Sequence, residues 1–352
     1  MNIAVWAPFL SKETTDFENF IVETTRHFLL HYQDDKVFIL TETEPLSHFT
    51  FSENIEIIIT RPQQDNALLR KIWWDVKLPP VLKKIEADLF VSFTGRCSLT
   101  ASIPQFIFSI EAERLRSSFI KKAQLVFVIS EIIKQQLIKS HKISGEKIVV
   151  IYPSPGKCYS PIDTTKKEDI KVEYSEGKEF FLYNSSFNKQ EDIIDLLKSF
   201  SHFKKRQQSS FKLLILAESN PFFEQTLSTY KYRNDVKLIG AKDQKIRAAI
   251  TTAAYAVVLP FNSNEDIFAA LNAMGSGVPL IATKNSGVNE VAGDTAVYAE
   301  REIKDIGEKM MQLYTNESLR SELIGKGKER VKDFSYEKAA ESLWQAIRRP
   351  IK

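Results

Sequence analysis

One stretch of this chain, residues 256–293, constrains the fold more than any other. It opens with an apolar run at 256–259 that stops at Pro260, a pattern typical of a strand buried on both faces of a parallel sheet. Apolar residues at helical spacing then predict a helix over 265–274, which the Gly-Ser-Gly sequence at 275–277 ends. The stretch therefore predicts a strand-helix unit of an α/β fold.

A second unit of the same kind follows at once, with a short strand predicted at 279–283 and a helical segment at 288–291. In open parallel sheets, ligands bind at the carboxyl ends of strands, where loops meet the N-termini of helices. Free backbone amides and the helix dipole favour an anion such as a diphosphate at such a place. The alternative is a pair of ordinary strand-helix units without a ligand, and the local pattern does not decide between the two.

Strands alternate with helical segments through the rest of the chain, and the alternation starts afresh once. Residues 1–152 predict one α/β domain, and the proline-rich and charged segment 153–178 predicts a linker. Residues 179–335 predict a second α/β domain, and 336–352 a C-terminal helix that can pack back on the first domain. We therefore expect two doubly wound, Rossmann-like domains that face each other across a cleft.

Composition narrows the classes of function. The 352 residues carry a net charge of +3, which is too small an excess to indicate nucleic-acid binding. Cys97 and Cys158 form neither a metal-ligand spacing nor a disulfide framework. The N-terminus carries no basic leader, and no apolar run has the length of a membrane span. We expect a cytoplasmic protein without a bound metal or cofactor, in at most weak peripheral contact with the inner face of the membrane.

The order of these motifs resembles the group 1 glycosyl transferases, which are retaining enzymes of the GT-B fold. Segments 127–131 and 146–153 are similar to the end of the family's first domain, and 236–240 to a strand that precedes its donor site. The sequences AMGSGVPLIA at 273–282 and GVNEVAGD at 287–294 match the family closely. The resemblance implies a nucleoside-diphosphate-sugar donor in the second domain and an acceptor on the first.

Two glutamates of the family's donor motif are replaced in this chain. Counting back from the Ala-Met pair places Asn264 and Asn272 at their positions. The resemblance implies a contact of the second position with the donor ribose, which the amide of Asn272 can make, and of the first position with the sugar. Glu265 lies one residue late and can take the first role only if the loop shifts. Neither asparagine carries a charge that could help a developing positive centre on the sugar.

The residues that hold the diphosphate in the family also differ here. Asn184, Ser185 and Ser186 occupy the region where the family has a glycine-arginine pair, and none of them is an arginine. Glu191 stands at the position of the family's lysine. Lys189 lies two residues earlier, and its long stem allows it to reach a diphosphate. The alternative for Lys189 is a solvated loop residue.

The resemblance points to five further positions. Gly240 and Ala241 correspond to residues near the base, and Gly287 and Glu290 to residues that hold the loop at the second helix start. In the first domain, the predicted strand 105–110 corresponds to one that ends in a His-Asp pair, and Glu111 stands there instead. Glu111 could act as an acid-base group, although a glutamate at a helix N-terminus is a common structural feature.

Together these features predict a retaining, hexosyltransferase-type enzyme. It would move a sugar from a nucleotide-diphosphate sugar to a hydroxyl of a carbohydrate or lipid-linked acceptor, in glycan, glycolipid or polysaccharide biosynthesis. The catalytic residues would be Glu265 and Glu111. Two alternatives stay open, namely a non-catalytic relative that keeps the fold for binding or assembly, and a different transferase or an epimerase on the same scaffold.

Overall fold

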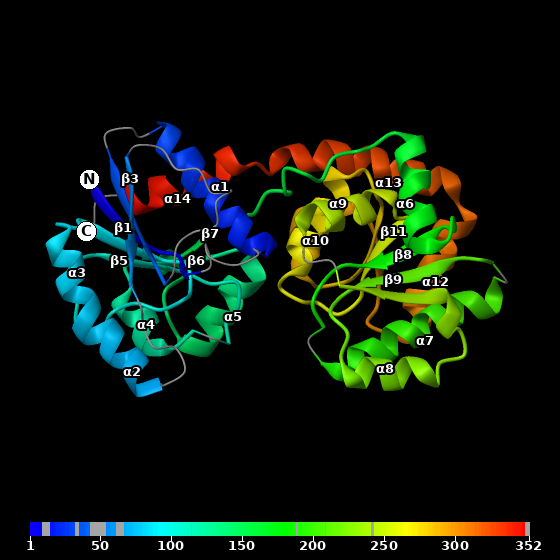
Figure 1. Cartoon of the computed structure of the whole chain (residues 1–352), viewed down its shortest axis with the longest axis horizontal. Helices are drawn as coiled ribbons and strands as arrows, with labels where there is room; N and C mark the ends of the chain where they lie inside the picture. The colour runs from blue at the N-terminus through cyan, green and yellow to red at the C-terminus, as the bar shows by residue number, and fades with distance from the viewer. Residues whose placement is uncertain are drawn as a thin grey trace. The chain divides into compact units, whose positions relative to one another are not determined.

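The computed structural model describes residues 1–8, 15–31, 35–42, 54–60, 67–113, 115–187, 189–207, 209–240 and 243–348. The chain divides into two compact units, which we call unit 1 (Met1–Pro153 with Ser335–Lys352) and unit 2 (Ser154–Phe334). Each unit is built on one parallel sheet with helices between its strands (Figure 1). The predicted two-domain α/β fold class is therefore confirmed.

Unit 1 contains a seven-stranded sheet in the order β3-β2-β1-β4-β5-β6-β7, in which every pairing is parallel. The central strands are apolar runs buried on both faces, as a covered parallel sheet requires. The strands are β1 (Asn2–Trp6), β2 (Lys36–Thr41), β3 (Ile55–Ile59), β4 (Leu89–Ser92), β5 (Gln105–Phe108), β6 (Leu125–Val128) and β7 (Ile148–Val150). The helices are α1 (Asp16–His31), α2 (Ala67–Ile72), α3 (Leu78–Lys84), α4 (Ser117–Lys122), α5 (Glu131–His141) and α14 (Tyr336–Arg348).

The last helix of the chain, α14, packs on α1, so the two ends of the chain share one core (Figure 1). Tyr336 stacks on the ring of Phe20 at a centroid distance of 6.3 Å and also stacks on His27. Trp344 is fully buried. Burial of so large a side chain gives α14 a substantial share of the stability of unit 1.

Unit 2 contains a six-stranded parallel sheet in the order β10-β9-β8-β11-β12-β13. The strands are β8 (Phe180–Tyr183), β9 (Lys212–Leu216), β10 (Val236–Ile239), β11 (Ala256–Leu259), β12 (Leu280–Thr283) and β13 (Ala296–Ala299). The helices are α6 (Thr164–Ser175), α7 (Gln190–Arg206), α8 (Pro221–Ser228), α9 (Gln244–Ala253), α10 (Asp266–Gly275), α11 (Gly287–Ala292), α12 (Ile303–Thr315) and α13 (Glu317–Arg330). The strand order reverses between β8 and β11, which makes this pair the topological switch point of the sheet.

Three elements of unit 2 differ from the sequence-based prediction. The predicted linker contains helix α6, which carries the charged run at 166–169 and packs on α9. Helix α8 and strand β13 were not predicted at all. Strand β13 is only four residues long and includes two alanines, so its pattern is too weak to separate it from a loop.

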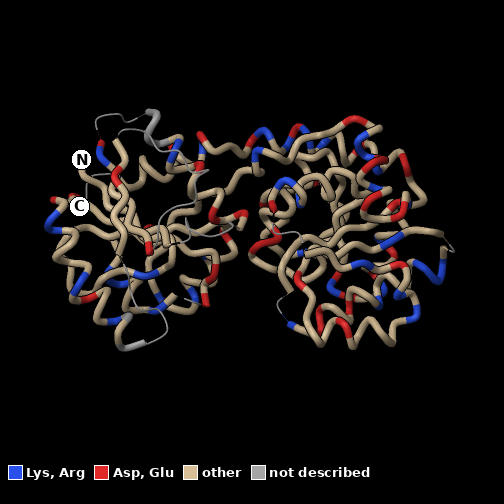
Figure 2. The backbone as a smooth tube through the Cα atoms, viewed as in Figure 1, with Lys and Arg blue, Asp and Glu red and all other residues tan. Residues whose placement is uncertain are grey.

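Acidic and basic residues alternate over the outer helices of both units, whereas the strands carry few charges (Figure 2). This mixture agrees with the small net charge of +3. None of the helices in the described part of the chain combines the length and the apolar character that a membrane span needs.

Candidate functional site

Two loops meet at the carboxyl ends of β8 and β11. Tyr183 ends β8, and its buried hydroxyl donates to the carbonyl of Ser186 at 2.7 Å, while its ring stacks on Phe187 at a centroid distance of 4.4 Å. These contacts fold the chain sharply after the strand. As a result, the loop that starts at Asn184 stays at the switch point, where open α/β sheets bind their ligands.

The loop after β11 is held by its own side chains. The carboxylate of Asp266 accepts a hydrogen bond from the Ser263 amide at 2.9 Å, and the Ser263 hydroxyl accepts one from the Glu265 amide at 3.3 Å. Asn262 has a positive φ of 55°, which asparagine tolerates better than most residues, and it accepts a hydrogen bond from Thr283 on β12. Helix α10 therefore begins at the switch point in a defined orientation.

The two loops contact each other through Ser186 and Glu265, because the Ser186 hydroxyl donates to a carboxylate oxygen of Glu265. Glu265 is partly exposed. The structure thus brings one predicted catalytic residue, Glu265, next to the predicted donor loop. We call Asn184, Ser185, Ser186, Glu265 and Asp266 the switch-point site.

Three buried oxygen atoms of this site have no hydrogen-bond partner of good geometry among the described residues. They are Asn184 Oδ1, Ser185 Oγ and Asp266 Oδ1. Ser185 and Asp266 lie close enough to hydrogen-bond to each other, whereas no described residue bonds to Asn184 Oδ1. Because buried polar atoms are nearly always hydrogen-bonded, Asn184 Oδ1 is the atom of the site that calls for a polar ligand. The other end of the Asn184 amide donates to Thr251 at 3.3 Å, which fixes its orientation.

Asp266 is only 1% exposed, and burial raises the pKa of its carboxyl to about 7. The nearby charges of Glu265 and Asp192 raise this pKa further, and Ser185 lies close enough to oppose the shift in part. A carboxyl with such a pKa is partly protonated near neutral pH. It therefore adds less negative charge to the site than its residue type suggests.

A cationic side chain that the sequence analysis did not predict, Arg301, lies at the edge of the switch-point site. Arg301 follows β13, and its guanidinium donates to Asp192 Oδ1 at 3.3 Å. Asp192 is buried in the first turn of α7, where its other oxygen accepts the Lys189 amide at 3.0 Å. The Arg301 side chain is 51% exposed, so a guanidinium with five N–H donors retains some for a ligand. The motif comparison could not find Arg301, because it lies beyond a strand that was not predicted.

Asn272, predicted to contact the donor ribose, makes a structural hydrogen bond in this structure. Its side chain is 2% exposed, and its Oδ1 accepts a hydrogen bond from the Gly156 amide at 2.8 Å. Gly156 lies in the segment that enters unit 2, so Asn272 attaches this segment to α10. In this structure Asn272 therefore positions the chain, and its contact with the donor ribose stays a prediction.

The hydrogen bond between Asn272 and the Gly156 amide predicts the behaviour of Asn272→Ala. The variant leaves the buried Gly156 amide without an acceptor, which costs about 1–3 kcal/mol of stability. We expect a lower Tm in thermal melts and an unchanged affinity in a titration with UDP. An unchanged Tm together with weaker UDP binding would instead support the ribose contact.

The remaining predicted residues lie at separate places. The side chain of Lys189 is exposed at the start of α7, and Asn264 is partly exposed beside Glu265. Gly240 follows β10 and lies next to Glu218. Gly287 is the first residue of α11, directly after the N-cap residue Ser286. The Glu290 carbonyl accepts a hydrogen bond from Arg330 at 3.0 Å. Ala241 lies outside the described residues. Glu111 belongs to unit 1, where its backbone amide and carbonyl both bond to the Ser109 hydroxyl.

Comparison with known proteins decides the family. Residues 165–330, nearly all of unit 2, match the model of the family described as glycosyl transferases group 1. Unit 2 is a group 1 glycosyl transferase domain. The resemblance predicted from the motifs at 273–282 and 287–294 is thereby confirmed, and the switch-point site belongs to a glycosyl transferase domain.

Individual relatives of this glycosyl transferase domain are distant. An uncharacterized glycosyltransferase of Methanocaldococcus jannaschii is 26% identical over 223 residues, covering 60% of this chain and 56% of the relative. A chitobiosyldiphosphodolichol beta-mannosyltransferase of Kluyveromyces lactis is 27% identical over 187 residues, covering 46% and 42%. The matches thus span about half the length of these curated relatives.

The solved structures show that the fold extends beyond the glycosyl transferase domain. The crystal structure of Anabaena HepE in complex with UDP-glucose matches with a TM-score of 0.75, at 12% identity and with 99% of both chains covered. At this identity the match shows the fold alone. Both units therefore have the GT-B architecture that the motif order predicted.

Proposed function

We propose that this protein is a retaining glycosyltransferase that takes its sugar from a nucleoside diphosphate sugar. The observation that carries the proposal is the buried Asn184 Oδ1, which has no partner among the described residues and lies at the switch point of a group 1 glycosyl transferase domain. Hydroxyls of the sugar or ribose can donate to this oxygen, whereas the diphosphate only accepts and would take its hydrogen bonds from the Ser185 hydroxyl and the cationic side chains. The acceptor would be a hydroxyl of a carbohydrate or of a lipid-linked sugar.

Each residue of the site has a role in this proposal. Asn184 and Ser185 would bond to the donor, and Arg301 with Lys189 would balance the charge of the diphosphate. Glu265, oriented by Ser186, would face the sugar and stabilise the positive charge that develops at its reacting carbon. Because cationic side chains and amides supply the positive charge, the proposal requires no metal.

The test is donor turnover followed by NMR. Wild-type protein is incubated with UDP-glucose, UDP-galactose, UDP-N-acetylglucosamine and GDP-mannose, and release of the nucleotide and the anomeric form of the product are recorded. We expect release from one donor with retention, and a decrease of about two orders of magnitude in Glu265→Gln, the usual effect of removing one preorganised electrostatic contact. Release that is equally fast in Glu265→Gln would contradict the proposed role.

A second candidate is a relative that binds nucleotide without turnover. One observation favours it, namely that Asn272 is buried against Gly156 at a position where the family carries a donor-binding glutamate. This candidate predicts that UDP or GDP raises the Tm while no donor is consumed. Donor consumption with retention would exclude it.

A further inference from the structure

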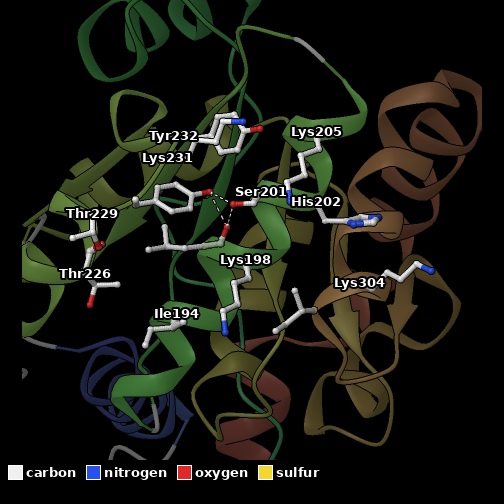
Figure 3. Close-up of a pocket in the computed structure, with 13 residues that line it drawn as sticks. Ile194, Lys198, Ser201, His202, Lys205, Thr226, Thr229, Lys231, Tyr232 and Lys304 are labelled. Carbon is white, nitrogen blue, oxygen red and sulfur yellow. Dashed lines mark hydrogen bonds between the residues drawn. The ribbon is translucent and has the colours of Figure 1, made fainter.

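Unit 2 contains a pocket apart from the switch-point site. It lies along the exposed side of α7, between the end of α8 with the following turn and the first turn of α12, and its volume is about 670 Å³ (Figure 3). We call it the α7 pocket. None of its described lining residues belongs to the switch-point site. Its size falls within the range of about 300–1,000 Å³ that is usual for small-molecule sites.

The sequence of α7 explains why this helix contributes so many lining residues. Ile194, Lys198, Ser201 and Lys205 are spaced four, three and four residues apart and therefore share one face of the helix. The opposite face carries Phe200 and Phe203, among others, which are buried in the core. Figure 3 shows Thr226 and Thr229 on one side of this face and His202 and Lys304 on the other.

The charged residues that line the pocket are all basic. Lys198, Lys205, Lys231, Lys304 and His202 line it, and no aspartate or glutamate occurs among its described lining residues. Within the described ranges, no ion pair is found for Lys198, Lys205 or Lys304, and Lys231 lies over the ring of Tyr232 at 5.2 Å. Four lysines that line one pocket without an acidic residue among them attract an anion.

Other basic residues on α7 pair with acidic residues, unlike the lysines that line the pocket. Lys204 is buried and pairs with Asp235 at 2.9 Å, and Arg206 pairs with Glu308. Glu308 also bonds to His202 at 2.9 Å, so the acid at the rim of the pocket is already engaged by two partners. On α7, the described lysines that line the pocket, Lys198 and Lys205, have no such acidic partner.

The uncharged residues that line the pocket are suited to contact a sugar or nucleoside ring. The Tyr230 hydroxyl donates to the Leu197 carbonyl at 2.7 Å and accepts from Ser201 at 2.9 Å, so this ring is fixed in place (Figure 3). Ile194 and Ile303 add apolar surface, and Thr226 and Thr229 add hydroxyl groups. Apolar and hydroxyl surfaces side by side can contact both the faces and the edges of a sugar or nucleoside.

We propose that the α7 pocket binds a phosphate ester carried on a body the size of a sugar or nucleoside. A phosphate monoester carries about −1.5 to −2 charges at pH 7 and therefore matches several lysines, whereas a single carboxylate would leave most of them unbalanced. Such a group occurs on free sugar phosphates and on phospholipid headgroups. The chemistry is the same for both, and the experiment separates the two sources.

The experiment measures how fast each lysine of the full chain is acetylated, by mass spectrometry, with two probes. One probe is glucose 6-phosphate, and the other is phosphatidylcholine vesicles with or without phosphatidic acid. We expect at least one probe to slow the acetylation of Lys198, Lys205, Lys231 and Lys304 several-fold. Lys237 and Lys245, which are exposed elsewhere in unit 2, should react at unchanged rates.

Paired variants test the same proposal by affinity. Lys198→Ala/Lys205→Ala should weaken binding of the protecting probe by about tenfold or more, as expected when charged contacts are lost. Lys237→Ala/Lys245→Ala removes the same net charge outside the pocket and should have little effect. Protection by glucose 6-phosphate supports a soluble ligand, and protection only by phosphatidic acid supports a headgroup. Absence of protection by either probe, or equal weakening in both variants, would overturn the proposal.

Discussion

Arg301→Gln is expected to weaken the binding of UDP by about tenfold or more, since a hydrogen bond to a charged group contributes about 1.5–3 kcal/mol. The sequence comparison found no arginine in the region 184–186 and placed Glu191 at the position of the family's lysine, and the structure offers Arg301 as a cation near this region. Its guanidinium lies at the start of α7, held by a buried Asp192 that is close enough to influence Asp266 at the start of α10. Isothermal titration with UDP measures the loss.

Glutamine is chosen because its amide can still donate to Asp192, so the buried carboxylate keeps a partner. The matched control is Arg206→Gln, because Arg206 is 50% exposed, compared with 51% for Arg301, and also pairs with a carboxylate in unit 2. Arg206→Gln should bind UDP like the wild type. If the two variants bind UDP equally well and melt like the wild type, Arg301 does not bind the diphosphate.

Asp266→Asn is expected to make the protein more stable at pH 8 and to leave it unchanged at low pH. The carboxyl has a pKa of about 7 in the folded protein, raised by burial, against an ordinary value of 3.8. Below pH 3.8 the group is protonated in both states and contributes no difference. As pH rises from there to about 7, only the unfolded state ionises freely, so stability falls, and above pH 7 the full penalty persists.

An asparagine carries no such penalty and can still accept from the Ser263 amide. One pKa unit corresponds to about 1.4 kcal/mol, so a gain of at least ~1 kcal/mol, or roughly 2–4 °C in Tm, is expected at pH 8. Thermal melts between pH 4 and pH 8 measure it, with Asp169→Asn, at an exposed position on α6, as the control. A variant that is less stable than the wild type at pH 8 would show that the folded protein favours the ionised form of Asp266.

The local sequence pattern was sufficient to predict the strands and helices with a clear apolar periodicity or a clear end signal. The apolar run at 256–259 and the Gly-Ser-Gly at 275–277 located β11 and the end of α10, because burial on both faces and the conformational freedom of glycine leave few alternatives. The pattern missed β13 and α8, which are short. It also missed α6 inside the predicted linker, since that helix is polar on nearly all sides and only tertiary contact with α9 supports it.

The candidate site could be predicted in part. The motifs directed attention to the loops after β8 and β11, which the structure brings into contact through Ser186 and Glu265. They could not show that Asn272 turns toward Gly156, a residue 116 positions away in sequence, nor that Arg301 approaches Asp192 across 109 positions. Both contacts depend on how distant segments pack, which residue spacing does not encode.

A crystal structure of the protein with UDP tests the central claim most directly. We predict that the diphosphate lies at the carboxyl ends of β8 and β11, with the Ser185 hydroxyl bonded to it and the guanidinium of Arg301 beside it. A nucleotide bound elsewhere on the chain, or a switch-point site without nucleotide at saturating UDP, would contradict the account.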